Sequence, residues 1–87
     1  MSGRAAAPLL AALFYYVCAD GSTFTAQFEP KADLMLVERG GVAHTLAHQM
    51  SADGARYADK RLEVWGKGRG ARVTDLTTGA AVQCEER

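Results

Sequence analysis

Short β-rich segments separated by turn residues are the feature that most limits how this chain can fold. Such segments recur about every 8–12 residues, a spacing typical of an antiparallel barrel or sandwich. No segment after residue 13 has a competing helical period. The chain is therefore predicted to be all-β. The expected strands are residues 13–18, 23–28, 34–38, 42–48, a short one near 55–57, 61–66, 71–75 and 80–84.

Alternation within these strands predicts which side chains face the core. Phe24, Ala26 and Phe28 alternate with polar residues, and Leu62 and Val64 do the same. If the sheet closes into an eight-stranded barrel, its interior is just wide enough to be filled by side chains. We therefore expect a packed lumen rather than a ligand cavity.

Composition and motifs argue against several classes of function. Lysine plus arginine and aspartate plus glutamate each number 10, so the formal net charge is zero. This balance gives no support to a nucleic-acid partner, which needs a basic excess.

No nucleophile, P-loop or dinucleotide motif occurs, so we expect no enzyme activity and no cofactor. His44 and His48 would lie about 13 Å apart on a strand, so they are expected to face solvent or an edge and bind no metal.

The N-terminal residues resemble a weak signal peptide. An arginine is followed by an apolar run through Val17, but cleavage within that run would remove the expected first strand. We therefore assign residues 1–12 to an N-terminal arm or leader remnant. Residues 13–87 form one domain.

The two cysteines lie near the two ends of this domain. In an exported chain of this size, Cys18 and Cys84 would more often form a bridge than stay free. A bridge would stabilise the fold by about 4 kcal/mol in the chain-entropy picture. The alternative is a pair of buried thiols that pack as small hydrophobic side chains.

Two loops carry the candidate functional residues, because loops bear function in barrels and sandwiches. In residues 51–57, Asp53 and Gly54 form a natural turn. In residues 65–69, Gly66 and Gly68 flank Lys67, which we expect to project from a sharply bent backbone. From the residue types alone, Lys67 is a solvated turn lysine or a point charge for an acidic cleft. Tyr57 is expected to pack its ring and bond its hydroxyl to the backbone, and Trp65 to pack first and anchor an interface second.

Four short patterns together resemble the periplasmic and membrane-bound inhibitors of C-type lysozyme (MliC/PliC-type). The family patterns are Y-x-C-x-x-G, S-G-x-x-Y, W-x-K-G-x-x-A and a final cysteine. They fall in the same order on this chain from residue 16 to residue 84. The matching residues are Tyr16, Cys18, Gly21, Gly54, Tyr57, Trp65, Lys67, Gly68, Ala71 and Cys84.

The resemblance implies an eight-stranded antiparallel barrel, a disulfide between the first and last cysteines, and export to the periplasm or outer membrane. It also allows a membrane tether carried by the native N-terminus. It further implies that the two loops enter the substrate cleft of C-type lysozyme, where a serine and a lysine engage the catalytic Glu and Asp. By position, the lysine role falls on Lys67, the tyrosine role on Tyr57, and Ser51, Gly54 and Gly68 complete the site.

One position departs from the family pattern. The family's serine falls on Asp53, and an ionised carboxylate can only accept hydrogen bonds. Against two enzyme carboxylates it would add like-charge repulsion. Either Asp53 is protonated, or it turns outward while Ser51 or a backbone amide serves. We therefore expect an inhibitor that is weaker than its family or directed at a variant lysozyme. The alternative is a non-inhibitory envelope barrel that binds another partner or has a structural role.

Overall fold

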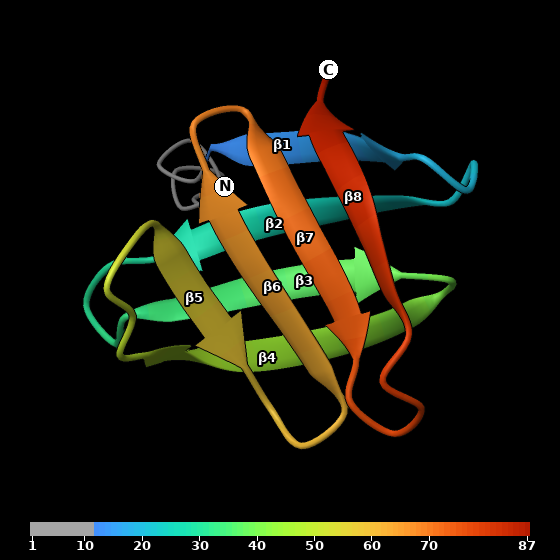
Figure 1. Ribbon diagram of the computed structural model, residues 1–87. Coiled ribbons are helices and arrows are strands. Elements are labelled where there is room, and N and C mark those ends of the chain that lie inside the picture. Colours follow the sequence, from blue (N-terminus) through green and yellow to red (C-terminus); the bar gives the residue numbers. More distant parts are fainter. Residues whose placement is uncertain (1–11) are drawn as a thin grey trace.

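The computed structural model describes residues 12–87, which form one closed antiparallel barrel (Figure 1). Each strand pairs with the next, and β8 returns to pair with β1. The predicted all-β class is confirmed. Of the expected arm at residues 1–12, all but residue 12 lies outside the described residues. The strands are β1 (Leu13–Cys18), β2 (Thr23–Glu29), β3 (Leu34–Arg39), β4 (Val42–Gln49), β5 (Ala55–Ala58), β6 (Leu62–Lys67), β7 (Gly70–Asp75) and β8 (Ala81–Glu86).

The turn chemistry explains why the strands end where they do. At the β3–β4 hairpin, Gly40 and Gly41 have φ of 59° and 78°, which a side chain would disfavour. At the β6–β7 hairpin only Gly68 has positive φ, at 60°. The expected sharp bend on both sides of Lys67 is therefore wrong for Gly66. That residue is an ordinary strand position, paired with Ala55 and Ala71.

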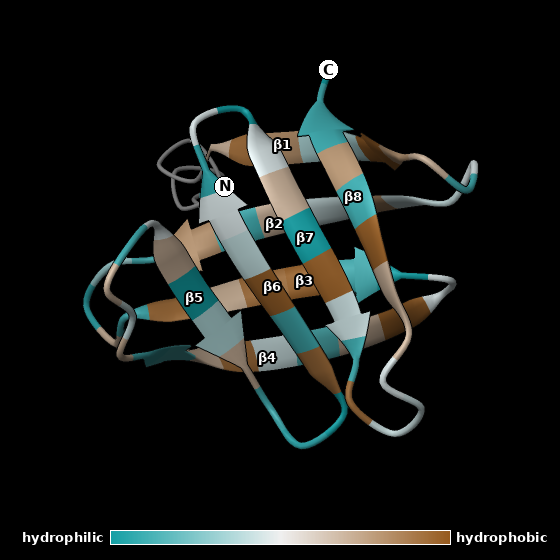
Figure 2. Cartoon of the chain, viewed as in Figure 1, coloured by the Kyte–Doolittle hydropathy of each residue, from teal (hydrophilic) through white to brown (hydrophobic). Residues whose placement is uncertain are grey.

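The core lies inside the barrel, where alternate side chains of every strand point. Figure 2 shows the resulting alternation of hydrophobic and hydrophilic residues along β6 and β7. Phe24, Leu46, Val37, Val64 and Val73 are the largest side chains that are fully buried, apart from the disulfide. None of the buried residues in the described range is charged. The predicted core positions are confirmed for Phe24, Ala26, Leu62 and Val64, whereas Phe28 at the barrel end is 41% exposed.

The disulfide joins the strands that close the barrel. Cys18 and Cys84 are direct partners in the β1–β8 register, both are buried, and their sulfur atoms are bonded. The alternative of two free thiols is excluded, since no free cysteine is present. The two cysteines are 66 positions apart in the sequence, and the bridge links the first and last strands of the domain.

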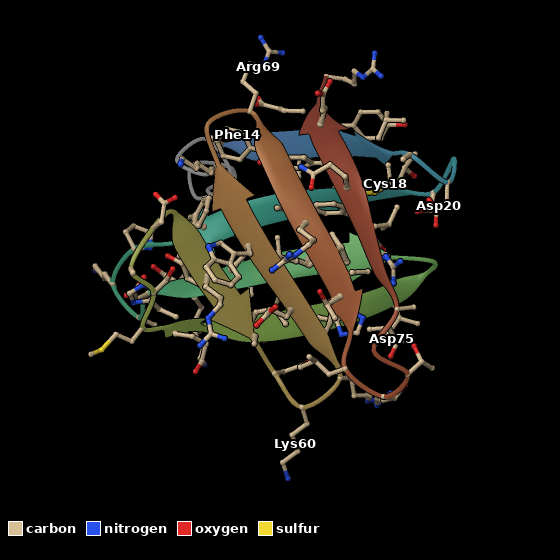
Figure 3. All side chains as sticks on the ribbon, viewed as in Figure 1. Phe14, Cys18, Asp20, Lys60, Arg69 and Asp75 are labelled. Atoms are coloured by element: carbon tan, nitrogen blue, oxygen red, sulfur yellow. A yellow bond between two sulfur atoms is a disulfide. The ribbon has the colours of Figure 1, made fainter. Side chains whose placement is uncertain are left out.

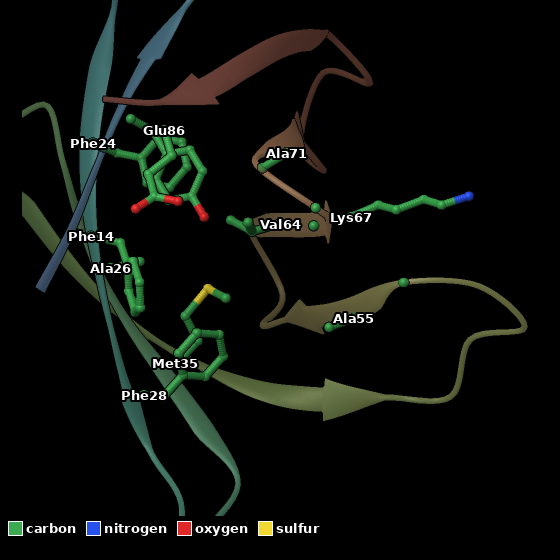
Figure 4. A pocket seen from close by; sticks show the side chains of 14 residues that line it. Phe14, Phe24, Ala26, Phe28, Met35, Ala55, Val64, Lys67, Ala71 and Glu86 are labelled. Carbon is green, nitrogen blue, oxygen red and sulfur yellow. The ribbon is translucent and has the colours of Figure 1, made fainter. Parts of the chain in front are cut away.

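The lumen is packed as expected over most of its length, but the expectation fails at one end. There a cavity of about 420 Å³ opens to solvent (Figure 4). Its physical origin is a row of small residues, because Ala55, Gly66 and Ala71 are neighbours across β5, β6 and β7. These three positions supply no bulk opposite the aromatic side chains of β1 and β2.

Candidate functional site

The two predicted loops meet at one end of the barrel. The β4–β5 loop (50–54) leads into β5, and the β6–β7 turn follows β6, the strand that pairs with β5. The register sets Ala55 opposite Gly66, and Lys67 opposite Gly70. Ser51, Asp53 and Gly54 are thus brought next to Lys67 and Gly68, although about a dozen residues separate the two groups in the sequence.

Direct contacts hold the β4–β5 loop against β6. The indole Nε1 of Trp65 donates a hydrogen bond of 2.7 Å to the carbonyl oxygen of Asp53. Ser51 Oγ donates to the same carbonyl at 2.5 Å and accepts from the Asp53 amide at 3.3 Å. The serine hydroxyl is therefore committed within the turn, and the loop is fixed before any partner arrives.

Gly54 allows this close approach. It has a φ of 69°, and a Cβ built there would lie 2.5 Å from the carbonyl oxygen of Gly66. Replacing Gly54 with alanine is therefore expected to lower the free energy of unfolding by about 2–3 kcal/mol, through positive-φ strain plus displacement of the loop. Denaturant unfolding monitored by circular dichroism measures this change.

Gly40 provides the matched control, because its φ is 59° and nothing lies within 4 Å of a Cβ placed there. Gly40→Ala should lower the free energy of unfolding by about 1 kcal/mol, through positive-φ strain alone. Equal losses in the two variants would mean that the contact with Gly66 contributes nothing.

Lys67 and Asp53 form an exposed ion pair. The ammonium nitrogen Nζ lies 2.7 Å from Asp53 Oδ2, and the side chains are 74% and 66% exposed. Exposed pairs of this kind contribute at most about 1 kcal/mol, so the pair is easily exchanged for another partner. Sequence reasoning treated the two residues separately, and neither their spacing nor their types indicated that they bind each other.

Trp65 lies on the outer face of the barrel between two arginines. Its register partners are Arg56 on β5 and Arg72 on β7, and their guanidinium carbons lie 5.6 and 5.4 Å from the ring centroid. Arg56 also pairs with Glu63 at 2.8 Å. Arg72 takes part in none of the ion pairs within residues 12–87. Sequence reasoning missed both arginines, although a predicted register of β5, β6 and β7 would have aligned them with Trp65.

Tyr57 lies inside the barrel and not on the loop surface. Its side chain is buried, packs edge-on to Phe28, and donates a hydrogen bond of 2.8 Å to Asp33 Oδ1. Burial raises the pKa of the Tyr57 phenol above its ordinary value, and the Asp33 carboxylate raises it further. The hydroxyl therefore stays protonated as a donor. The expected backbone partner is wrong, because the partner is a side-chain carboxylate on the β2–β3 turn.

Of the two histidines, His48 faces solvent as expected, and His44 does not. His44 is largely buried, with 13% of its side chain exposed, and its Nδ1 lies 3.4 Å from Asp59. His48 is exposed and its Nδ1 lies 3.1 Å from Asp33, the residue that also binds Tyr57. Each histidine thus faces a different carboxylate. Within the described range there is no cluster of three residues able to hold a metal ion.

Comparison with known proteins identifies the family. The sequence model of a family described as the membrane-bound lysozyme inhibitor of c-type lysozyme matches residues 16–81. This chain belongs to that family. Family membership confirms the resemblance seen in the sequence patterns, and the family's description associates it with a membrane. None of the curated protein sequences gives a significant match.

A solved structure supports the same assignment. The chain is similar to Pseudomonas aeruginosa MliC, as seen in its crystal structure in complex with hen egg white lysozyme. The two share 30% sequence identity with a TM-score of 0.72, and the match covers 88% of this chain and 82% of that one. No helix in residues 12–87 is long and apolar enough to cross a membrane.

Proposed function

We propose that this protein inhibits C-type lysozyme by inserting the β4–β5 loop and the β6–β7 turn into the enzyme's substrate cleft. The observation that carries the proposal is the exposed ammonium of Lys67 at the barrel end, beside a loop held by Trp65 and Gly54. A rigid turn that presents one mobile point charge suits a cleft whose catalytic groups are carboxylates. Membership in the inhibitor family and similarity to a lysozyme-bound relative support the same function.

The proposed mechanism is an exchange of ion-pair partners. Lys67 leaves Asp53 and engages the catalytic carboxylates of the enzyme, where exclusion of water strengthens the interaction. Gly68 keeps the turn narrow enough to enter. Arg72, which is exposed and free of ion pairs within residues 12–87, adds positive charge beside the turn.

The remaining predicted site residues have supporting roles in this proposal. Ser51 shapes the loop through its bonds to Asp53, so its hydroxyl is not needed as a donor to the enzyme. Tyr57 anchors β5 from inside the barrel by binding Asp33. Asp53 is the one group that opposes binding, because it holds Lys67 in the free protein and carries the wrong charge for an acidic cleft.

We further propose that the protein works in the periplasm or at the outer membrane. A disulfide that joins the first and last strands is stable in an oxidising compartment and is rare in the cytosol. The family's description as membrane-bound is consistent with this location. A membrane tether of the kind that the family's description names would hold the barrel at the surface where an incoming lysozyme acts.

Replacing Asp53 with serine is expected to tighten inhibition about tenfold. The change releases Lys67, removes a negative charge facing the enzyme's carboxylates, and restores a hydroxyl that can donate. The inhibition constant against hen egg white lysozyme, measured by lysis of bacterial cell walls, checks this prediction.

Glu38→Gln is the matched control, since Glu38 is exposed on β3, outside both loops, and its loss changes the net charge by the same amount. The control should leave the inhibition constant unchanged. If Asp53→Ser weakens inhibition instead, Asp53 contributes to the interface and its assigned role is wrong.

The inhibitory function itself is tested on a panel of C-type lysozymes. Purified protein in micromolar excess should reduce the lytic activity of at least one of them. Full activity of every enzyme on the panel would reject the function, and a pull-down from host secretions would then identify the partner of a non-inhibitory envelope barrel.

A further inference from the structure

The cavity inside the barrel has the form of a binding site. At about 420 Å³ it falls within the size range of pockets that hold small molecules. It lies at the same end as the β6–β7 turn, and Gly54, Lys67 and Gly68 are among the residues that line it. Figure 4 shows side chains of β1–β3 facing those of β5–β7 across the cavity, which opens to solvent at this end of the barrel.

One wall of the cavity is aromatic. Tyr16 stacks on Phe24 with ring centroids 4.6 Å apart, and Phe14 meets Phe28 edge-to-face at 6.1 Å. Met35 adds a flexible side chain to the same wall. Because these rings are held by one another, they form a preformed apolar surface with little freedom to collapse inward.

The opposite wall is made of small residues. Ala55, Gly66 and Ala71 lie side by side across three strands, with Val64 beneath them. A larger residue at any of these inward positions would fill the space, as side chains do elsewhere in the lumen. The cavity is therefore a consequence of three particular residues and not of the barrel geometry.

A single carboxylate lies at the mouth. Glu86 is the last residue of β8, its side chain is half-buried, and it is the direct register partner of Tyr16. Burial raises the pKa of the Tyr16 phenol above its ordinary value, and the nearby charge of Glu86 raises it further. None of the ion pairs within residues 12–87 involves Glu86.

The Lys67 ammonium does not pair with the Glu86 carboxylate at the mouth of the cavity. Its side chain extends away from the cavity in Figure 4, and its ammonium binds Asp53. The polar character of the mouth is therefore set by the Glu86 carboxylate and the Tyr16 hydroxyl. An apolar ligand with a positively charged end would match both the aromatic wall and the mouth.

We propose that this cavity binds small amphipathic amines, with the apolar part against Phe14 and Phe28 and the ammonium at Glu86. The carboxylate supplies a charge-assisted hydrogen bond, and the aromatic faces add favourable contact with a cation. This proposal is tested separately from lysozyme inhibition, because the aromatic wall and Glu86 belong to β1, β2 and β8 and not to the two loops.

The test uses the full chain and a fluorescent apolar amine, N-phenylnaphthylamine, whose emission rises in apolar surroundings. The probe should bind saturably. Hexylammonium should displace it at concentrations roughly tenfold lower than hexanoate, which has the same chain length and the opposite charge. Absence of saturable binding, or equal displacement by the two competitors, would overturn the proposal.

Two variants locate the site. Ala71→Leu fills the cavity from the wall of small residues and should weaken probe binding about tenfold, while circular dichroism reports that the barrel is intact. Glu86→Gln should keep the probe bound but remove the preference for hexylammonium. Glu85→Gln, on the neighbouring exposed position of β8, should retain that preference. A preference that survives Glu86→Gln would exclude this carboxylate and overturn the assignment.

Discussion

Replacing Lys67 with alanine is expected to weaken inhibition of C-type lysozyme by about a hundredfold, equivalent to about 3 kcal/mol. The side chain is 74% exposed in the free protein, so its loss removes no packing. In the proposed complex its ammonium is desolvated against carboxylates, and removing it leaves those charges unpaired. The inhibition constant from cell-wall lysis, with binding measured by calorimetry, gives the size of the effect.

Lys60→Ala is the control for the change in charge. Lys60 lies in the turn between β5 and β6, at the end of β6 opposite to Lys67 (Figure 3). This variant should inhibit like the native protein. If both variants inhibit as strongly as the native protein, Lys67 does not belong to the interface. If both inhibit more weakly by a similar factor, the effect comes from long-range electrostatic attraction instead.

Removing the disulfide is expected to have the largest effect on stability. The double variant Cys18→Ala/Cys84→Ala should lose about 4 kcal/mol of unfolding free energy, since the bridge closes a loop with a sequence separation of 66. A domain of this size has a net stability of roughly 4–13 kcal/mol, so the loss is a large fraction of the total. The melting temperature should fall by roughly 20 °C.

The native protein in a reducing agent is the matched comparison, because it breaks the same bond without changing a residue. Both samples should unfold at the same lower temperature. If the double variant loses less than about 1 kcal/mol, the closing pair β1–β8 would be held by its backbone bonds and core contacts alone.

Local sequence signals were sufficient to predict the strands. Alternation around Phe24 and Leu62, and turn glycines such as Gly40, depend on neighbours in the chain, and the observed strands begin and end within about two residues of those expected from such patterns. The ends of β8 and the straight backbone at Gly66 were less predictable. A glycine can bend the chain or merely lack a side chain, and only the pairing partners decide between the two.

The contacts that shape the site depend on register, which no single segment reveals. Lys67 meets Asp53 across 14 residues, and Tyr57 meets Asp33 across 24. The cavity arises in the same way, because Ala55 and Ala71 are unremarkable until pairing sets them on either side of Gly66. The family patterns identified which residues to examine, but the intramolecular partner of Lys67 required the folded chain.

The most direct test of the proposed inhibition is competition for the lysozyme cleft. A soluble oligosaccharide analogue of the substrate should displace this protein from hen egg white lysozyme, with an apparent dissociation constant for the protein that rises linearly with the analogue concentration. Both ligands would then occupy one cleft, as insertion of the Lys67 turn requires. Unchanged binding of the protein at a saturating concentration of the analogue would contradict that mechanism.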